Sequence, residues 1–222
     1  MRLHTTASRS EASILSTNKV LKNTYMLLAA TLLFSAATAG LSMHLNLPHP
    51  GFIVTMVVYF GLLFLTSKLS NSAWGILSVF ALTGFMGLTL GPIIGMYVNN
   101  FSNGHELVMT ALGGTGVIFL GLSGYALTTQ KDFSFLGGFL MVGILVAFLA
   151  GIGAFVFNLP SLSLAVSAMF ILLMSALILY ETSSIIHGGE TNYIMATVTL
   201  YISIYNLFTS LLHILGIFGG ED

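Results

Sequence analysis

The sequence predicts an all-α integral membrane protein with seven transmembrane helices, and two observations support this prediction. The chain of 222 residues is 56% hydrophobic and only 6% charged, whereas soluble domains carry about 25% charged residues. Seven long apolar stretches follow one another along it, and a helix needs about 20 such residues to cross the hydrocarbon core. Because so little charge does not keep a globule in water, we expect the bilayer to be its solvent.

The seven apolar stretches are separated by short breaks rich in Pro, Gly, Asn and Ser, which are typical of turns. Because all the breaks are short, consecutive helices are expected to run antiparallel within one transmembrane domain, residues 19–218. The predicted spans are residues 21–43, 51–69, 73–97, 107–128, 133–157, 160–186 and 193–217.

The basic residues predict the orientation of the chain. All six lie before or at the very start of the first span, at the end of the second span, or in the loop after the fourth span, and the loops after the first, third and fifth spans contain none. The positive-inside rule therefore places the N-terminus and the loops after the second and fourth spans in the cytoplasm. The loop after the sixth span falls on the same side, although it has no basic residue. The six residues are Arg2, Arg9, Lys19, Lys22, Lys68 and Lys131.

The two ends of the chain lie outside the predicted domain. Residues 1–18 are polar and rich in Ser and Thr, without the apolar stretch of a cleaved signal peptide, and they predict a flexible cytoplasmic tail. Residues 219–222 predict a short periplasmic C-terminus. Arg2, Arg9, Lys19 and Lys22 are interpreted either as a topological anchor that also touches anionic membrane lipid or as contacts for a protein partner.

The sequence contains no pattern that indicates catalysis, a cofactor or a metal. There is no cysteine, which excludes disulfides and thiolate sites, and a net charge of −1 argues against nucleic acid. His105 and Glu106 begin like a zinc-protease motif, but Met109 stands where the second His should be. His44 and His49 share an outer loop and are at most weak ligands. We expect no enzyme, no cofactor and no metal.

Glu181 is the only acidic residue well inside a predicted span. It lies about five residues from the cytoplasmic end of the sixth span, at a depth of about 8 Å. A carboxylate in hydrocarbon is costly, so this side chain should face the bundle interior, a partner or a water-filled cavity. Two interpretations stay open: a proton- or ion-sensitive gate, and an acid that makes one interhelical hydrogen bond or reaches the wet end of the bundle.

The seventh span carries a stripe of polar residues, spaced alternately by four and three positions, which places them on one helical face. Lipid does not tolerate such a stripe, so we expect the seventh helix to be central. The first part of this stripe, Thr199 and Ser203, is expected at about the same depth in the membrane as Glu181. Hydrogen bonds between helices are one interpretation, and a hydrated sensing or conduction path is the other. The stripe consists of Thr199, Ser203, Asn206, Ser210 and His213.

Rows of small residues predict close helix packing, because they let backbones approach one another in lipid. We expect this packing within the monomer, and a homo-oligomer face is the alternative. Pro92 is expected to bend the third helix. The rows are Gly87, Gly91 and Gly95 in the third span, Gly113, Gly114, Gly116, Gly121 and Gly124 in the fourth, and Gly143, Ala147 and Gly151 in the fifth.

The loop between the sixth and seventh spans contains Gly188 and Gly189, which make a flexible connection. It is interpreted either as a plain turn or as an exposed partner contact that offers His187 and Glu190.

Three segments and the arrangement of the spans carry a resemblance to a known family. The arrangement combines seven spans, an acid near the cytoplasmic end of the sixth and a polar seventh span. The chain resembles the Bax inhibitor-1 family, also called the transmembrane Bax inhibitor motif family, over essentially its whole length. The segments are residues 16–25 (STNKVLKNTY), 127–138 (LTTQKDFSFLGG) and 180–194 (YETSSIIHGGETNYI).

The resemblance is strongest to a bacterial modulator of the membrane-anchored protease FtsH. It implies a multi-pass protein of the bacterial inner membrane that binds FtsH, with its associated proteins HflK and HflC, and restrains the degradation of membrane proteins. It also implies that the cytoplasmic tail, residues 1–18, makes the modulator a slow substrate of the protease.

The wider family includes pH-sensitive calcium-leak proteins, in which two aspartates on the sixth and seventh helices share a proton and gate a pore. The resemblance places the first of them at Glu181, which keeps the acid, and the second at Ser203, which cannot ionise. One carboxylate does not titrate as a coupled pair. The serine at position 203 thus counts against a pH-sensitive calcium leak, which is kept as the alternative function.

Overall fold

The computed structural model describes residues 3–220, with side chains from residue 17 onward. Within that range it contains seven α-helices, each with a segment long and apolar enough to cross a membrane. The predicted fold class is confirmed, and the ends of α2 to α7 agree with the predicted spans to within a few residues. The helices are α1 (Leu3–His44), α2 (Phe52–Leu69), α3 (Trp74–Asn100), α4 (Gly104–Thr129), α5 (Leu136–Val156), α6 (Pro160–Ile186) and α7 (Tyr193–Gly219).

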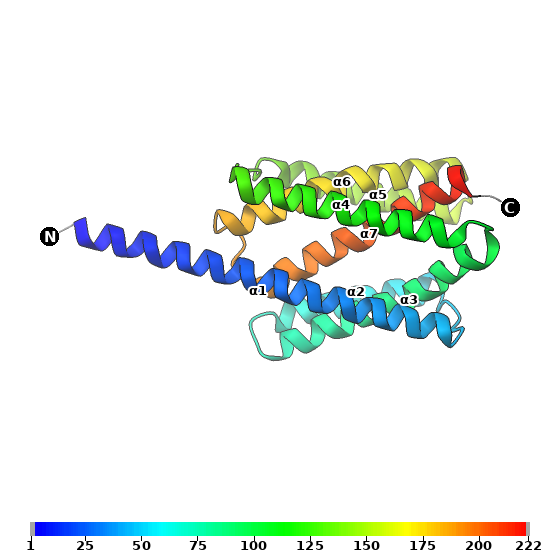
Figure 1. Ribbon diagram of the computed structural model, residues 1–222, viewed down its shortest axis with the longest axis horizontal. Helices are drawn as coiled ribbons and strands as arrows, with labels where there is room; N and C mark the ends of the chain where they lie inside the picture. The colour runs from blue at the N-terminus through cyan, green and yellow to red at the C-terminus, as the bar shows by residue number, and fades with distance from the viewer. Residues whose placement is uncertain (1–2, 221–222) are drawn as a thin grey trace.

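Helix α7 lies at the centre of the bundle. It packs against α1, α3, α4 and α6, and Figure 1 shows it running between a layer made of α1, α2 and α3 and a layer made of α4, α5 and α6. The central position predicted from its polar stripe is confirmed. Helices α2 and α5 lie outermost, since α2 packs mainly on α3 and α5 on α6.

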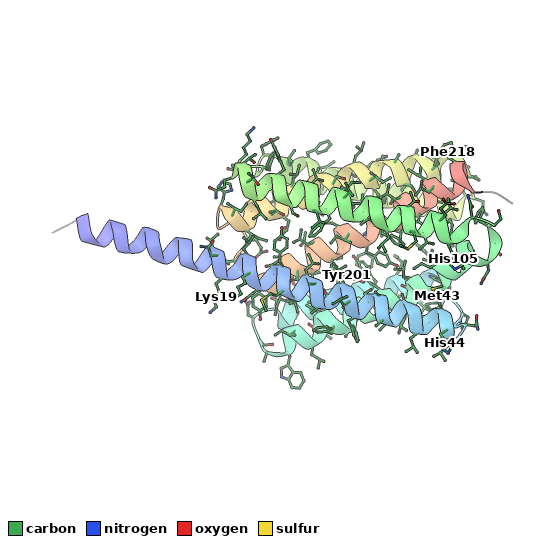
Figure 2. The ribbon with its side chains drawn as sticks, in the orientation of Figure 1. Lys19, Met43, His44, His105, Tyr201 and Phe218 are labelled. Carbon is green, nitrogen blue, oxygen red and sulfur yellow. The ribbon has the colours of Figure 1, made fainter. Side chains whose placement is uncertain are left out.

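The loops α2–α3, α4–α5 and α6–α7 lie at one end of the bundle, together with Lys19 (Figures 1 and 2). We call this end, which also carries Lys22, Lys68 and Lys131, the basic end, and the opposite end the far end. Figure 2 shows Met43, His44 and His105 at the far end.

The N-terminal part of α1 differs from the predicted tail. The helix begins at Leu3, and Figure 1 shows its first part projecting beyond the basic end of the bundle. The segment that can span a membrane begins only at Thr17. Because residues 3–39 contain neither Gly nor Pro, nothing interrupts the helix, and extending an existing helix needs no new nucleus.

Helices α1 and α3 approach most closely at two glycines of α3. A Cβ atom at Gly87 would collide with the carbonyl of Ser35, and one at Gly91 would lie 2.6 Å from the carbonyl oxygen of Ala39. Backbone-to-backbone packing of this kind is what small residues allow in a membrane. The prediction of packing within the monomer is confirmed for this pair of helices.

The glycines of α4 behave differently. A Cβ atom would meet nothing within 4 Å at four of the five, so the prediction that they pack within the monomer is wrong for these positions. Spacing does not separate the two kinds either, because Gly95 continues the four-residue row of Gly87 and Gly91, and a Cβ atom there would also meet nothing within 4 Å. The four are Gly113, Gly116, Gly121 and Gly124.

Pro92 lies inside α3 without ending it. Proline has no N–H, so the carbonyl of Leu88, four residues earlier, loses its helical donor. The Oγ atom of Ser42 on α1 donates to this carbonyl at 2.8 Å. A hydroxyl from the neighbouring helix thus satisfies the acceptor that the proline leaves free.

Candidate functional site

Glu181 lies in α6 with only 5% of its surface exposed. No hydrogen bond to its carboxyl group is found among the described residues, and its Oε1 atom is buried without a partner. The interhelical hydrogen bond that the simpler interpretation expected is therefore absent there. An unpaired buried polar atom costs about 1–3 kcal/mol, which is a reason to look for function at this residue.

The residue that follows Glu181 connects α6 to α1, and α1 is connected to α7 at the adjacent position. The next residue, Thr182, has its Oγ1 atom 3.3 Å from the hydroxyl of Tyr25 on α1. The Oγ1 atom of Thr197 on α7 donates to the carbonyl of Thr24, also at 3.3 Å. The Oγ1 atom of Thr24 is itself buried without a partner. The two residues in contact, Tyr25 and Thr182, are thus each adjacent in sequence to a residue with a buried, unsatisfied polar atom, Thr24 on α1 and Glu181 on α6.

Ser183 fastens the α4–α5 loop to the end of α6. Its Oγ atom accepts from the backbone N of Phe133 and donates to the carbonyl of Lys131, both at 3.0 Å. The Nδ1 atom of His187 lies 2.9 Å from the Ser183 carbonyl. The basic end of α6, two residues beyond Glu181, is thereby held to a neighbouring loop.

Asp132, in the same loop, is fully exposed and caps the following turn. The backbone N of Ser134 donates to its Oδ1 atom at 2.8 Å. This hydrogen bond is the main reason why the pKa of the Asp132 carboxyl group is lowered, and the charge of His187 lowers it further.

The α6–α7 loop is a well-connected turn. The Oε1 atom of Glu190 accepts from the backbone N of Asn192 at 2.6 Å. The side chain of Asn192 caps α7 by accepting from the backbone N of Ile194, which is a common way to start a helix. Its Nδ2 atom donates to Asn71 Oδ1 at 3.1 Å and so ties this loop to the α2–α3 loop. Glu190 is half-buried, and its carboxyl group already accepts a hydrogen bond within the loop, whereas the side chain of His187 is exposed.

The polar stripe of α7 lies inside the bundle, as predicted. Ser203 and Ser210 are buried, and the other three residues are half-buried. The Oγ atom of Ser203 donates to the carbonyl of Thr199, and the Nδ2 atom of Asn206 to that of Ile202, both at 2.8 Å within α7. Of the five, His213 alone bonds another helix among the described residues, with its Nδ1 atom 2.7 Å from Ser167 Oγ.

Sequence reasoning missed Tyr201, which makes the main polar link from α7 to the α1–α3 layer. Its hydroxyl lies 2.5 Å from the Oγ atom of Ser35 and donates to the carbonyl of Thr83 at 3.3 Å. Tyr201 is 1% exposed, and Figure 2 shows it in the middle of the bundle. Tyrosines of membrane proteins gather at the interfaces, so a tyrosine in mid-span was the available signal.

Of the four basic residues that were predicted as partner contacts near the N-terminus, two have described side chains. Lys19 and Lys22 are exposed. Arg9 lies in the part of α1 whose side chains are not described, and Arg2 lies outside the described residues. No group of three His, Asp or Glu residues that could hold a metal occurs within the described range.

Comparison with known proteins agrees with this architecture. The model of the family "Inhibitor of apoptosis-promoting Bax1" matches residues 17–220. The chain is 54% identical, over 97% of both chains, to the protein named "Modulator of FtsH protease YccA" of Escherichia coli K12. The same identity relates it to a protein of another E. coli strain named "Inner membrane protein YccA". It is 55% identical to an uncharacterised protein of Pseudomonas aeruginosa, over 91% of both chains.

Proposed function

The chain belongs to the family of inhibitors of apoptosis-promoting Bax1, and we propose that it is an inner-membrane regulator that binds the FtsH protease and restrains its degradation of membrane proteins. The observation that carries the proposal is the identity of 54%, over 97% of both chains, to a protein named as a modulator of FtsH protease. A relative of equal identity is named as an inner membrane protein, and the seven spans agree with that location.

The shape of the basic end supports a protein partner on that side, which we take to be the cytoplasm. Helix α1 projects there beyond the bundle (Figure 1), and Lys19 and Lys22 are exposed where it leaves the bundle. We propose that FtsH, together with HflK and HflC, is contacted through this end, and that the protein has no catalytic activity of its own.

The test is a pull-down of the tagged chain from detergent-solubilised membranes, followed by mass spectrometry. The full chain, a form lacking residues 2–16 and the double variant Lys19→Ala/Lys22→Ala are compared. Lys68→Ala is the matched control, because Lys68 is an exposed lysine of the same end outside α1. We expect the full chain and the control to recover FtsH with HflK and HflC.

The outcomes separate the possible contacts. Loss of FtsH from the truncated form or the double variant would place the contact on α1. Recovery with all forms would place it in the membrane-embedded helices. Failure of the full chain to recover the protease would overturn the proposal.

A second candidate function, a pH-sensitive calcium leak, is favoured by one observation, the buried and unpartnered Oε1 atom of Glu181. Against it, position 203 is a serine, and its hydroxyl is engaged with the carbonyl of Thr199. The variant Glu181→Gln separates the two functions. A regulator keeps its effect on FtsH and shows no calcium flux in proteoliposomes, whereas a leak shows flux that the variant changes.

A further inference from the structure

A pocket of about 340 Å³ opens at the far end of the bundle, between α1 and α3. It lies on the opposite side of the membrane from the basic end, near which Glu181 is located. Ser42 and Gly91 line its inner part, where the two helices are in contact, and Met43, Met96 and His49 line it further out. The proposed regulation of a protease does not use it.

The pocket follows from the packing of two parallel helices. Gly91 presses against the Ala39 carbonyl and against Ser42, whereas one turn later a Cβ atom at Gly95 would meet nothing within 4 Å. The helices therefore touch at Gly91 and leave space beyond it. Met43 and Met96 follow these contacts by four and five residues, which places them at nearly equal depth, about 6–8 Å further along.

The chemistry of the wall restricts what it can bind. Within the described residues the wall contains no Asp, Glu, Lys or Arg. Hard cations such as Ca²⁺ and Mg²⁺ need carboxylates or several oxygen ligands, and anions need positive partners. What the wall offers are two thioethers, one imidazole, and neutral amide and hydroxyl groups. Thioether sulfur selects soft metals such as Cu(I), and imidazole also binds copper.

We propose that this pocket binds one soft monovalent metal ion, Cu(I) or Ag(I), through the thioethers of Met43 and Met96, with His49 as a further ligand. Both methionines line the open pocket, and neither is fully buried, since Met43 is half-buried and Met96 is 51% exposed. A neutral set of ligands suits a monovalent ion, because little charge has to be compensated.

His49 is the ligand that must rearrange. Its Nδ1 atom accepts a hydrogen bond from the backbone N of Gly51 at 3.1 Å, so in this state that lone pair is occupied. A metal bound at Nδ1 replaces the Gly51 contact. No hydrogen bond of either thioether is found among the described residues, so the methionines need no such exchange.

The test uses the full-length protein in detergent without oxygen, titrated with Cu(I) in competition with the chelator bathocuproine disulfonate. We expect one Cu(I) per chain, and at least tenfold weaker binding in Met43→Leu and in Met96→Leu. Leucine keeps the volume of methionine closely, so the fold should survive. The control is Met109→Leu, because Met109 lies near the far end of α4 with 65% exposure and outside the pocket.

Unchanged affinity in both pocket variants, or an equal loss in Met109→Leu, would overturn the proposal. X-ray absorption at the copper edge of the unmodified protein gives a second measurement that does not depend on any variant's folding. Sulfur neighbours are expected, and a shell of nitrogen and oxygen alone would refute the thioether site.

Discussion

At the scale of single residues, the bundle depends on hydroxyl groups that replace missing backbone partners. Pro92 removes the donor for the Leu88 carbonyl, and Ser42 supplies one from another helix. The sequence shows the proline, and it contains many serines, but nothing in it indicates which serine faces Leu88. Such a pairing depends on the register of two helices, which only the packed structure defines.

Ser42→Ala is expected to lower the free energy of unfolding by about 1–3 kcal/mol, because a buried acceptor is left without a donor. The measurement is unfolding in mixed detergent micelles. Thr128→Ala is the control, since the exposed hydroxyl of Thr128 donates within its own helix to the Gly124 carbonyl. Its effect should stay within about 0.5 kcal/mol. Equal effects of both variants would contradict the role given to Ser42.

Asp132 gives a pH prediction outside the membrane. The pKa of its carboxyl group is lowered, first by the hydrogen bond from the Ser134 backbone. A lowered pKa stabilises the folded state at pH values above the unfolded pKa of about 3.9, and this contribution disappears as pH falls through the folded pKa. Asp132→Asn should therefore be less stable than the unmodified chain at pH 6, and the difference should shrink as the pH falls through the lowered pKa of the folded state. If the difference in stability persists at low pH, the effect of the substitution has a cause other than the Asp132 charge.

At the scale of helices, hydropathy predicted where α2 to α7 lie, because a span needs a fixed length of apolar residues. It did not predict the start of α1. A polar stretch rich in Ser and Thr has the composition of a tail, yet without Gly or Pro it continues a helix that the membrane segment has already formed. It also did not distinguish glycines in contact from glycines in open space.

Gly87→Ala and Gly113→Ala test that distinction. A methyl group at Gly87 meets the Ser35 carbonyl, whereas one at Gly113 meets nothing within 4 Å. Gly87→Ala should lower the free energy of unfolding by about 1–3 kcal/mol through overpacking. Gly113→Ala should leave it unchanged or raise it by up to about 1 kcal/mol, because alanine favours the helix. Thermal unfolding of both variants in one detergent measures this, and the reverse order would refute the α1–α3 contact.

At the scale of the whole molecule, the sequence predicted the central position of α7 but not how it is held. The polar stripe has the right spacing for a buried face, and that face is buried. Ser203 and Asn206, however, bond within their own helix. Links to the two layers come instead from Tyr201 to α1 and α3, from Thr197 to α1, and from His213 to α6. Spacing shows which face is buried, and only the neighbouring helices determine which hydroxyls find partners across it.

A double-mutant cycle on Tyr201→Phe and Ser167→Ala tests whether α7 is a rigid element between two layers. Tyr201 and His213, the partner of Ser167, are 12 residues apart in α7, about 18 Å along its axis. Sites this distant add within about 0.5 kcal/mol when the element between them does not move. Each single variant should cost about 0.6–1.7 kcal/mol, and the double variant should cost their sum, measured by unfolding in mixed micelles. A coupling above about 1 kcal/mol would mean that releasing one layer lets α7 shift against the other, and the two layers would then respond to each other through the central helix.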